Sequence, residues 1–128
     1  MKFSEEIPGN LNRVTRYDDS GVEINERYYP NSIILCPDEP VRAWDISSPE
    51  EISESTTHLF FAFEPEIILI GTGRRIHHPD PIVRVQFNQE GIGIEILDTA
   101  SACRTFNLIL AEGRRVVAGL LAPDISPQ

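Results

Sequence analysis

The chain has 128 residues, enough for one domain that buries roughly two-thirds of the surface its unfolded form exposes. Hydrophobic residues make up 41% and charged residues 24%, a globular composition that excludes an intrinsically disordered chain. The net charge of −9 repels phosphate backbones and anionic lipid surfaces, so it argues against nucleic-acid binding and membrane-surface binding.

The chain start and the cysteines point to a cytoplasmic protein. The stretch MKFSEEIPGN lacks the cationic and apolar regions of a secretory signal, and no apolar run approaches the roughly 20 residues of a membrane helix. Cys36 and Cys103 have no second thiol near either, which indicates neither a disulfide framework nor a metal site. We expect a single domain over residues 1–128, with an ordered core over 13–121 and flexible ends.

The N-terminal half predicts short strands followed by a helix. VTRY, VEI and SIILC are extended patterns separated by the turn signals DDSG and YPNS, and they suggest small strands leading into a buried one at residues 32–36. Ser48 as cap, Pro49 in the first helical position and Glu51 as the capping-box partner then predict the start of a helix. Its core-facing residues at helical spacing are Ile52, Thr56, Leu59, Phe60 and Phe63.

The C-terminal half predicts one β-α-β unit, a second helix and a last strand. The apolar run EIILI at 66–70 is typical of a strand covered on both faces, and IGIEIL at 92–97 predicts the next strand. Between them, Asp80 and Gly91 mark the ends of a helix over 81–90. DTASACRTFNLILAEG predicts a helix that ends at Gly113, and RRVVAGLL predicts the last strand. Strands joined in this way run parallel through a right-handed crossover.

Two loops follow the parallel strands and are expected to face each other at one edge of the sheet, where open α/β sheets bind ligands. They contain GTGRR, at 71–75, and DTASACR, at 98–104. Glycine backbone, arginine donors and the first amides of a helix together form a cradle for a carboxylate or phosphate. The candidate residues of this anion pocket are Gly71, Thr72, Gly73, Arg74, Arg75, Asp98, Thr99, Ser101, Cys103 and Arg104.

Each of these candidates also has a structural interpretation. The glycines can be turn residues, and the arginines can be surface charges or partners of nearby carboxylates. Asp98 is better explained as a helix cap than as a general base. Cys103, one turn into its helix, can be an activated nucleophile or a small buried hydrophobe. His77 and His78 are adjacent and lack the spacing of a metal site. The sequence therefore predicts no catalytic residue, no metal site and no cofactor.

IILIGTGRR followed by GIGIEILDTASACRTFNLILAEGRRVVAGLL resembles the family called domain of unknown function 498, and VEINERYYPNSIILCPD with Trp44 fits the family's N-terminal half. The resemblance covers residues 13–121. It implies a single compact three-layer α/β domain with a mixed central sheet and an added small β region. It also implies that no enzymatic activity or cofactor is expected. The resemblance further implies a role like that of eukaryotic relatives, which is action through protein association during assembly of mitochondrial complex I.

Three hypotheses of function follow. The first is a non-catalytic interaction or assembly protein with a protein partner. The second is a binder of a small anionic ligand, or an enzyme, that uses the crevice between Gly71–Arg75 and Thr99–Arg104. The third is a thiol enzyme built on Cys103.

Overall fold

The structure is a computed structural model that describes residues 7–123. Its centre is a five-stranded sheet made of β4 (Ile33–Leu35), β5 (Arg42–Ala43), β6 (Ile67–Gly71), β7 (Gly93–Leu97) and β8 (Val116–Leu120). Their spatial order is β5-β4-β8-β6-β7. β6 runs parallel to both β7 and β8, whereas β4 runs antiparallel to β8 and to β5. The predicted mixed sheet is confirmed.

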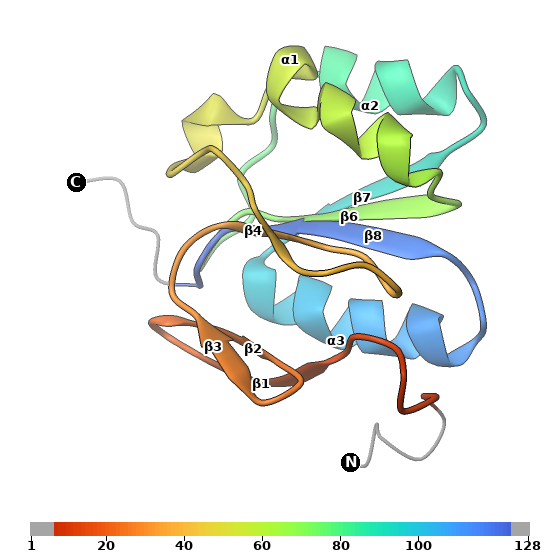
Figure 1. Cartoon of the computed structure of the whole chain (residues 1–128). Helices are drawn as coiled ribbons and strands as arrows, with labels where there is room; N and C mark the ends of the chain where they lie inside the picture. Colours follow the sequence, from red (N-terminus) through yellow and green to blue (C-terminus); the bar gives the residue numbers. More distant parts are fainter. Residues whose placement is uncertain (1–6, 124–128) are drawn as a thin grey trace.

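Helical segments cover both faces of this sheet. They are η2 (Pro49–Glu51), α1 (Glu54–Thr57), η3 (His58–Phe63), α2 (Ile82–Asn88) and α3 (Thr99–Ala111). Figure 1 shows α1 and α2 on one face and α3 on the other. The two crossovers of the parallel strands therefore lie on opposite faces, because α2 leads outward from β6 to β7 and α3 leads back to β8. The predicted three-layer fold is confirmed.

The small N-terminal β region is a second sheet on the α3 side of the molecule (Figure 1). It consists of β1 (Val14–Asp18), β2 (Gly21–Ile24) and β3 (Arg27–Tyr29), which form two consecutive antiparallel pairs. Asn107 of α3 joins this sheet to the core. Its Nδ2 donates to the Val14 carbonyl at 2.7 Å, and its Oδ1 accepts from the Val14 amide at 2.9 Å. The side chain thus replaces a missing strand neighbour for Val14.

The predicted β-α-β unit is confirmed, but its helix is shorter than the predicted 81–90, since α2 covers Ile82–Asn88 and its N-cap is Pro81 instead of Asp80. Asp80 Oδ1 accepts a hydrogen bond from the Ile82 amide at 2.9 Å, at the start of α2. Gly91 and Gly113, which follow α2 and α3, have φ angles of 77° and 80°. Such left-handed residues end helices, and glycine adopts them without steric cost.

The predicted single helix after Ser48 is wrong in its continuity. Glu51 Oε2 does accept from the Ser48 amide at 2.9 Å, so the start was correctly located. The chain then becomes extended at Ile52, with ψ of 113°, and a second helix start follows at Ser53, whose Oγ accepts from the Thr56 amide at 3.2 Å. Competing serine and threonine hydroxyls explain this break, because each offers the backbone a local alternative to a continuous helix.

The buried face of this segment also differs from the prediction. Thr57, Phe60 and Phe63 are buried, whereas Leu59 is 38% exposed. The buried residues are spaced by three, which is the period of the 3₁₀-helix η3 rather than of an α-helix. The segment thus buries Ile52, Phe60 and Phe63, in agreement with the prediction, but it does not bury Leu59, and it buries Thr57 in place of Thr56.

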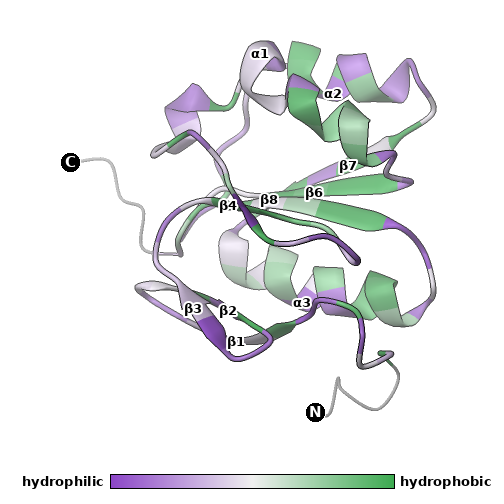
Figure 2. Ribbon diagram, viewed as in Figure 1, coloured by the Kyte–Doolittle hydropathy of each residue, from purple (hydrophilic) through white to green (hydrophobic). Residues whose placement is uncertain are grey.

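The hydrophobic core has two halves, one on each face of the sheet. Leu35, Leu69 and Ala118 face α3 and the small sheet. Ile68 and Ile70 face α1 and α2. Figure 2 shows hydrophobic residues along β6 and β8, between the two helical layers. β6 is therefore covered on both faces, which explains its uninterrupted apolar sequence.

The described ends pack against the domain. Ile7 is 4% exposed, and Asn12 Nδ2 donates to the Cys36 carbonyl at 2.9 Å. The remaining parts of the ends that we expected to be flexible, 1–6 and 124–128, lie outside the described residues. Within residues 7–123, no helix has both the length and the apolar character needed to span a bilayer.

Candidate functional site

The two predicted loops meet at one edge of the sheet. β6 and β7 run parallel, so the chain leaves both strands on the same side, and β8 ends there as well. The loop after β6 and the start of α3 therefore come together. The side chain of Thr99 lies between these two segments.

Thr99 fills the space between the loop and the strand ends. Its Oγ1 accepts from the Gly73 amide at 2.9 Å and donates to the Leu121 carbonyl at 2.7 Å. Its own amide donates to the Gly73 carbonyl at 2.8 Å. Thr99 is fully buried. The first amide of α3 and the loop backbone thus bind each other directly, at the edge where open α/β sheets in general hold ligands.

Gly71 and Thr72 form the base of the same contact. A Cβ atom on Gly71 would lie 2.9 Å from the Thr99 Cα, closer than real Cβ atoms approach, so glycine allows the strand end to reach α3. Thr72 is 1% exposed. Its Oγ1 donates to the Arg75 carbonyl at 2.6 Å and accepts from the His77 amide at 3.0 Å. These two residues hold the turn in shape.

Asp98 caps α3. Its Oδ1 accepts from the Ser101 amide at 2.8 Å, and its Oδ2 accepts from the Ser101 hydroxyl at 2.9 Å. The Ala102 amide donates to the Asp98 carbonyl at 2.9 Å. The carboxylate thus serves amides of the first helical turn, which is the cap role favoured by the sequence.

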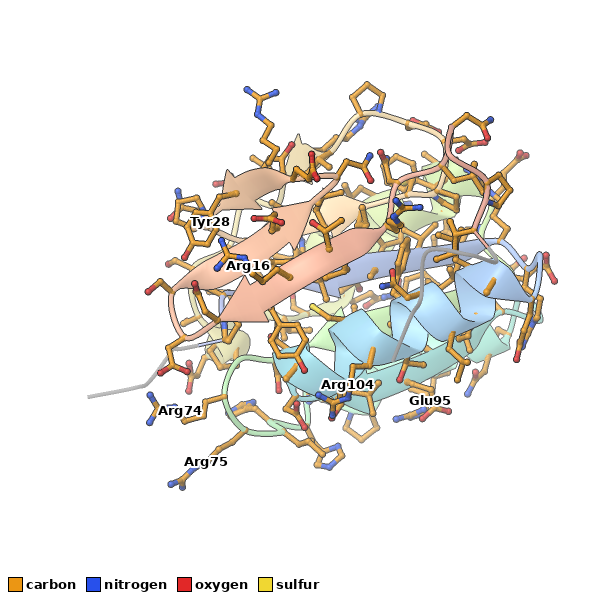
Figure 3. All side chains as sticks on the ribbon, turned by 90° about the horizontal axis from the view of Figure 1, so that it is seen from below. Arg16, Tyr28, Arg74, Arg75, Glu95 and Arg104 are labelled. Carbon is orange, nitrogen blue, oxygen red and sulfur yellow. The ribbon has the colours of Figure 1, made fainter. Side chains whose placement is uncertain are left out.

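The candidate arginines do not converge on one point. Arg104 Nη1 donates to the Tyr17 hydroxyl at 2.5 Å, and its Nη2 donates to the Ser101 Oγ at 3.2 Å. Figure 3 shows Arg74 and Arg75 projecting outward from their loop, away from Arg104. Both are exposed. Arg104 therefore links α3 to the small sheet, while the other two guanidinium groups lie at the surface.

A cavity of about 280 Å³ lies beside the contact between the loop after β6 and the start of α3. Three of the candidate residues line it, namely Gly73, Arg74 and Asp98. The hairpin residues Asp18 and Asp19 complete its wall, which the sequence analysis did not anticipate because DDSG indicated only a turn. The lining thus holds three carboxylates and one guanidinium group, so it is more acidic than the predicted anion cradle.

Asp18 is itself engaged in the hairpin. Its Oδ1 accepts from the Ser20 amide at 2.9 Å, and this hydrogen bond is the main cause that lowers the pKa of the carboxyl group below its ordinary value. The Tyr28 hydroxyl donates to the same oxygen at 3.1 Å. Asp18 is therefore held as a carboxylate that organises the turn between β1 and β2.

Cys103 lies inside the core. It is 1% exposed, and burial raises its pKa from 9.0 to about 12. The nearby Arg104 acts in the opposite direction but is the smaller effect. Burial likewise raises the pKa of Cys36 to about 11. Because the thiolate is the nucleophile, these environments oppose thiol chemistry at neutral pH.

A pH titration of stability tests the burial of Cys103. A thiol with a raised pKa in the folded state stabilises the fold below the pKa of the unfolded chain, and this stability is lost as the pH rises toward the folded pKa. Between pH 8 and pH 10.5 we expect Cys103 to contribute a loss of about 2 kcal/mol in the free energy of unfolding.

Cys103→Ala is the matched comparison, because it removes this ionisation and leaves every other titrating group in place; the packing lost with the buried sulfur is the same at every pH. Denaturant unfolding should show the variant to be less stable than the unsubstituted chain at pH 8. At pH 10.5 the difference in their free energies of unfolding should be smaller by about 2 kcal/mol. The burial of Cys103 would be contradicted if this difference in free energy did not change with pH. Rapid labelling of Cys103 by a thiol reagent at neutral pH would contradict it as well.

Known proteins show clear similarity to this chain. Residues 14–121 match the family described as protein of unknown function (DUF498/DUF598). The human protein named NADH dehydrogenase [ubiquinone] 1 alpha subcomplex assembly factor 3 is 35% identical over 112 residues, which are 86% of this chain and 60% of that protein. This chain thus spans less than two-thirds of the length of that relative.

Two bacterial proteins are similar as well. One from Francisella tularensis, named 13 kDa major membrane protein, is 32% identical over 73% of this chain and 76% of its own length. The crystal structure of a Bordetella parapertussis protein is 38% identical with a TM-score of 0.84, over 90% of this chain and 99% of that one. Since the family match covers both the parallel unit and the small sheet, this chain belongs to the DUF498/DUF598 family.

Proposed function

We propose that this chain is a non-catalytic protein-interaction module that acts in the manner of an assembly factor. The observation that carries the proposal is the similarity, over most of the chain, to relatives named as assembly factors of NADH dehydrogenase. Those relatives are longer than this chain, and the proposal does not assign their partners to it.

Two features of the site support this reading. The hydroxyl group of Thr99 and the carboxylate of Asp98 are engaged in internal hydrogen bonds that hold the loop and the helix start together. The buried Cys103 thiol has a pKa raised to about 12. Groups that would carry acid–base or nucleophilic chemistry thus serve the fold. The proposal includes a cytoplasmic location, which the two free, buried thiols support.

Quantitative co-purification from the source cells tests the proposal. The chain with an affinity tag should recover at least one protein in reproducible, near-stoichiometric amount. A tagged unrelated protein of similar size and negative charge should not recover it. If no protein is enriched over that control under any growth condition, the proposed function is contradicted.

The second candidate function is a binder of a small anionic ligand, or an enzyme acting on one, in the crevice between Gly71–Arg75 and Thr99–Arg104. The Arg74 guanidinium group, which lines the cavity of about 280 Å³, favours it, whereas the carboxylates of Asp18, Asp19 and Asp98 in the same lining oppose an anion. Thermal unfolding with a panel of carboxylates and phosphates tests it. A true ligand should raise the unfolding temperature of the chain and of Arg114→Ala, an exposed position outside the cavity, but not of Arg74→Ala. If no anion discriminates between these variants, this candidate fails.

A further inference from the structure

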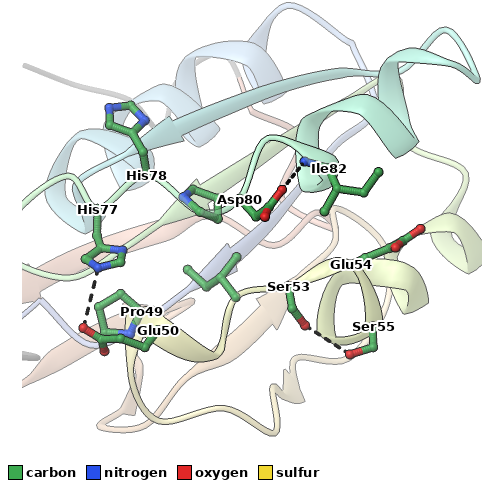
Figure 4. A pocket seen from close by; sticks show the side chains of 11 residues that line it. Pro49, Glu50, Ser53, Glu54, Ser55, His77, His78, Asp80 and Ile82 are labelled. Atoms are coloured by element: carbon green, nitrogen blue, oxygen red, sulfur yellow. Dashed lines mark hydrogen bonds and ion pairs between the residues drawn. The ribbon is translucent and has the colours of Figure 1, made fainter.

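A larger cavity, of about 620 Å³, lies on the opposite helical layer. It runs between residues 49–55, which form η2 and the start of α1, and residues 77–82, which lead into α2. Figure 4 shows these two segments facing each other across it. We call it the η2–α2 groove. None of the ten residues proposed for the anion pocket lines it.

The rim of the η2–α2 groove is acidic. Three carboxylates line it, from Glu50, Glu54 and Asp80, and its lining contains no lysine or arginine. The Glu50 side chain is 55% exposed and lies 3.5 Å from the Nε2 of His77. Three carboxylates on a chain of net charge −9, beside only two histidines, attract cationic groups and repel anions.

The interior of the groove is apolar. Ile52 is 4% exposed and forms part of the floor, while Ile82 at the entry to α2 is 41% exposed. Val85, one turn further along α2, is 40% exposed. Residues three apart share one face of a helix, so the apolar surface continues from the groove along α2. This continuation of the apolar surface beyond the groove suits a segment of polypeptide.

The two walls of the groove are fixed relative to each other. Gln86 Nε2 of α2 donates to the Thr57 Oγ1 of α1 at 2.6 Å, and both residues are buried. On the α1 side, the Ser53 hydroxyl accepts from the Thr56 amide at 3.2 Å. A binding surface that is already ordered loses less conformational entropy when a partner binds.

We propose that the η2–α2 groove is the docking surface for a basic, amphipathic segment of a partner protein. Its lysines or arginines would pair with Glu50, Glu54 and Asp80, and its apolar side chains would pack on Ile52 and Ile82. The inference rests on the proposed interaction function and assigns a surface and a chemical class to the partner. A metal ion does not fit, because no three His, Cys, Asp or Glu side chains among residues 7–123 are grouped to hold one.

An NMR titration with two synthetic helical peptides tests the groove. One peptide contains leucine and lysine, with leucines at every third or fourth position, and the other carries glutamate in place of lysine. The leucine–lysine peptide should shift the backbone amide signals of the non-proline residues within 49–55 and 77–85, and the glutamate peptide should not. The proposal would be overturned if the signals that shift at the lowest peptide concentration lay outside these two segments. It would also be overturned if spermidine, or a higher protein concentration without peptide, produced equal shifts.

Paired variants separate the groove from the general negative charge. Glu50→Gln with Glu54→Gln should weaken binding of the leucine–lysine peptide by about tenfold, which corresponds to about 1.4 kcal/mol from two carboxylates. Glu95→Gln with Glu112→Gln removes the same charge from exposed positions outside the groove and should change the affinity by less than about twofold. Equal losses from both pairs would overturn the proposal.

A second pair tests the apolar anchor. Ile82→Ser should weaken binding by about tenfold, whereas Leu108→Ser, at a 58% exposed position on α3, should leave it unchanged. The same variants distinguish the groove assignment from the proposed interaction function. If co-purified partners persist on the Ile82→Ser chain, the groove assignment fails while the interaction function stands. If no partner co-purifies with the unsubstituted chain, the interaction function itself fails.

Discussion

Replacing Gly119 by alanine should destabilise the domain by about 3 kcal/mol, one of the two largest effects we expect from a single substitution. Gly119 lies in β8, between β4 and β6. A Cβ atom there would lie 2.6 Å from a ring carbon of Trp44 and 2.7 Å from one of Phe60. Both rings are buried and pack against each other with centroids 5.3 Å apart.

Neither aromatic ring can move aside freely. Trp44 Nε1 donates to the Thr56 carbonyl at 2.9 Å, so a shift of the ring strains the link to α1. Thermal or denaturant unfolding measures the loss. Gly93→Ala is the control, because a Cβ atom there meets only Ile67 at an ordinary 3.6 Å. If both alanine variants lose similar stability, the packing of Trp44 and Phe60 on Gly119 is not the cause.

Replacing Thr99 by valine should cost a similar amount, about 3 kcal/mol. Valine keeps the shape of threonine but removes the hydroxyl group that accepts from the Gly73 amide and donates to the Leu121 carbonyl. Both backbone groups would then be buried without their partner, which is costlier than the simple loss of a hydrogen bond. Urea unfolding measures the change in the free energy of unfolding. The dependence of that free energy on urea concentration should be the same in both proteins.

Thr99→Ser provides the rescue. Serine keeps the hydroxyl group and loses one methyl group, so we expect it to recover most of the stability and to remain within about 1 kcal/mol of the unsubstituted chain. Hydrogen exchange at the Gly73 amide should be fast in the valine variant and slow in the serine variant. Equal stability of the two variants would show that the hydroxyl contacts do not hold the loop.

Local signals predicted the parallel half of the fold well. Asp98 was recognised as a helix cap, and Gly91 and Gly113 as helix ends, because these roles depend on neighbouring backbone alone. The apolar run of β6 identified a strand covered on both faces. From these elements the parallel pairing, and with it the position of the two loops, followed.

The segment after Ser48 shows where local signals compete. Its hydrophobic spacing suited an α-helix, but Ser53 formed a second cap and the chain tightened into the 3₁₀-helix η3. Phe60 packs against Trp44, which comes from another part of the chain. That tertiary contact, which no local pattern encodes, selected the residues that the segment buries.

Long-range contacts determined the candidate sites, and the sequence could not predict them. Asn107 reaches Val14, 93 residues away, and so brings the β1–β2 hairpin to the start of α3. Gln86 reaches Thr57, 29 residues away, and so fixes the walls of the η2–α2 groove. The side chain of Thr99, a candidate ligand contact in the sequence, joins the loop to α3 by accepting from the Gly73 amide.

Cross-linking in living cells tests the central claim, that this chain acts by holding a basic segment of another protein in the η2–α2 groove. A photo-reactive amino acid would replace Ile82 in one sample and Leu108, on α3, in the other. We predict that position 82 cross-links one discrete protein through a segment rich in lysine or arginine, and that position 108 does not. If position 82 cross-links nothing, or if both positions capture the same proteins, the account is contradicted.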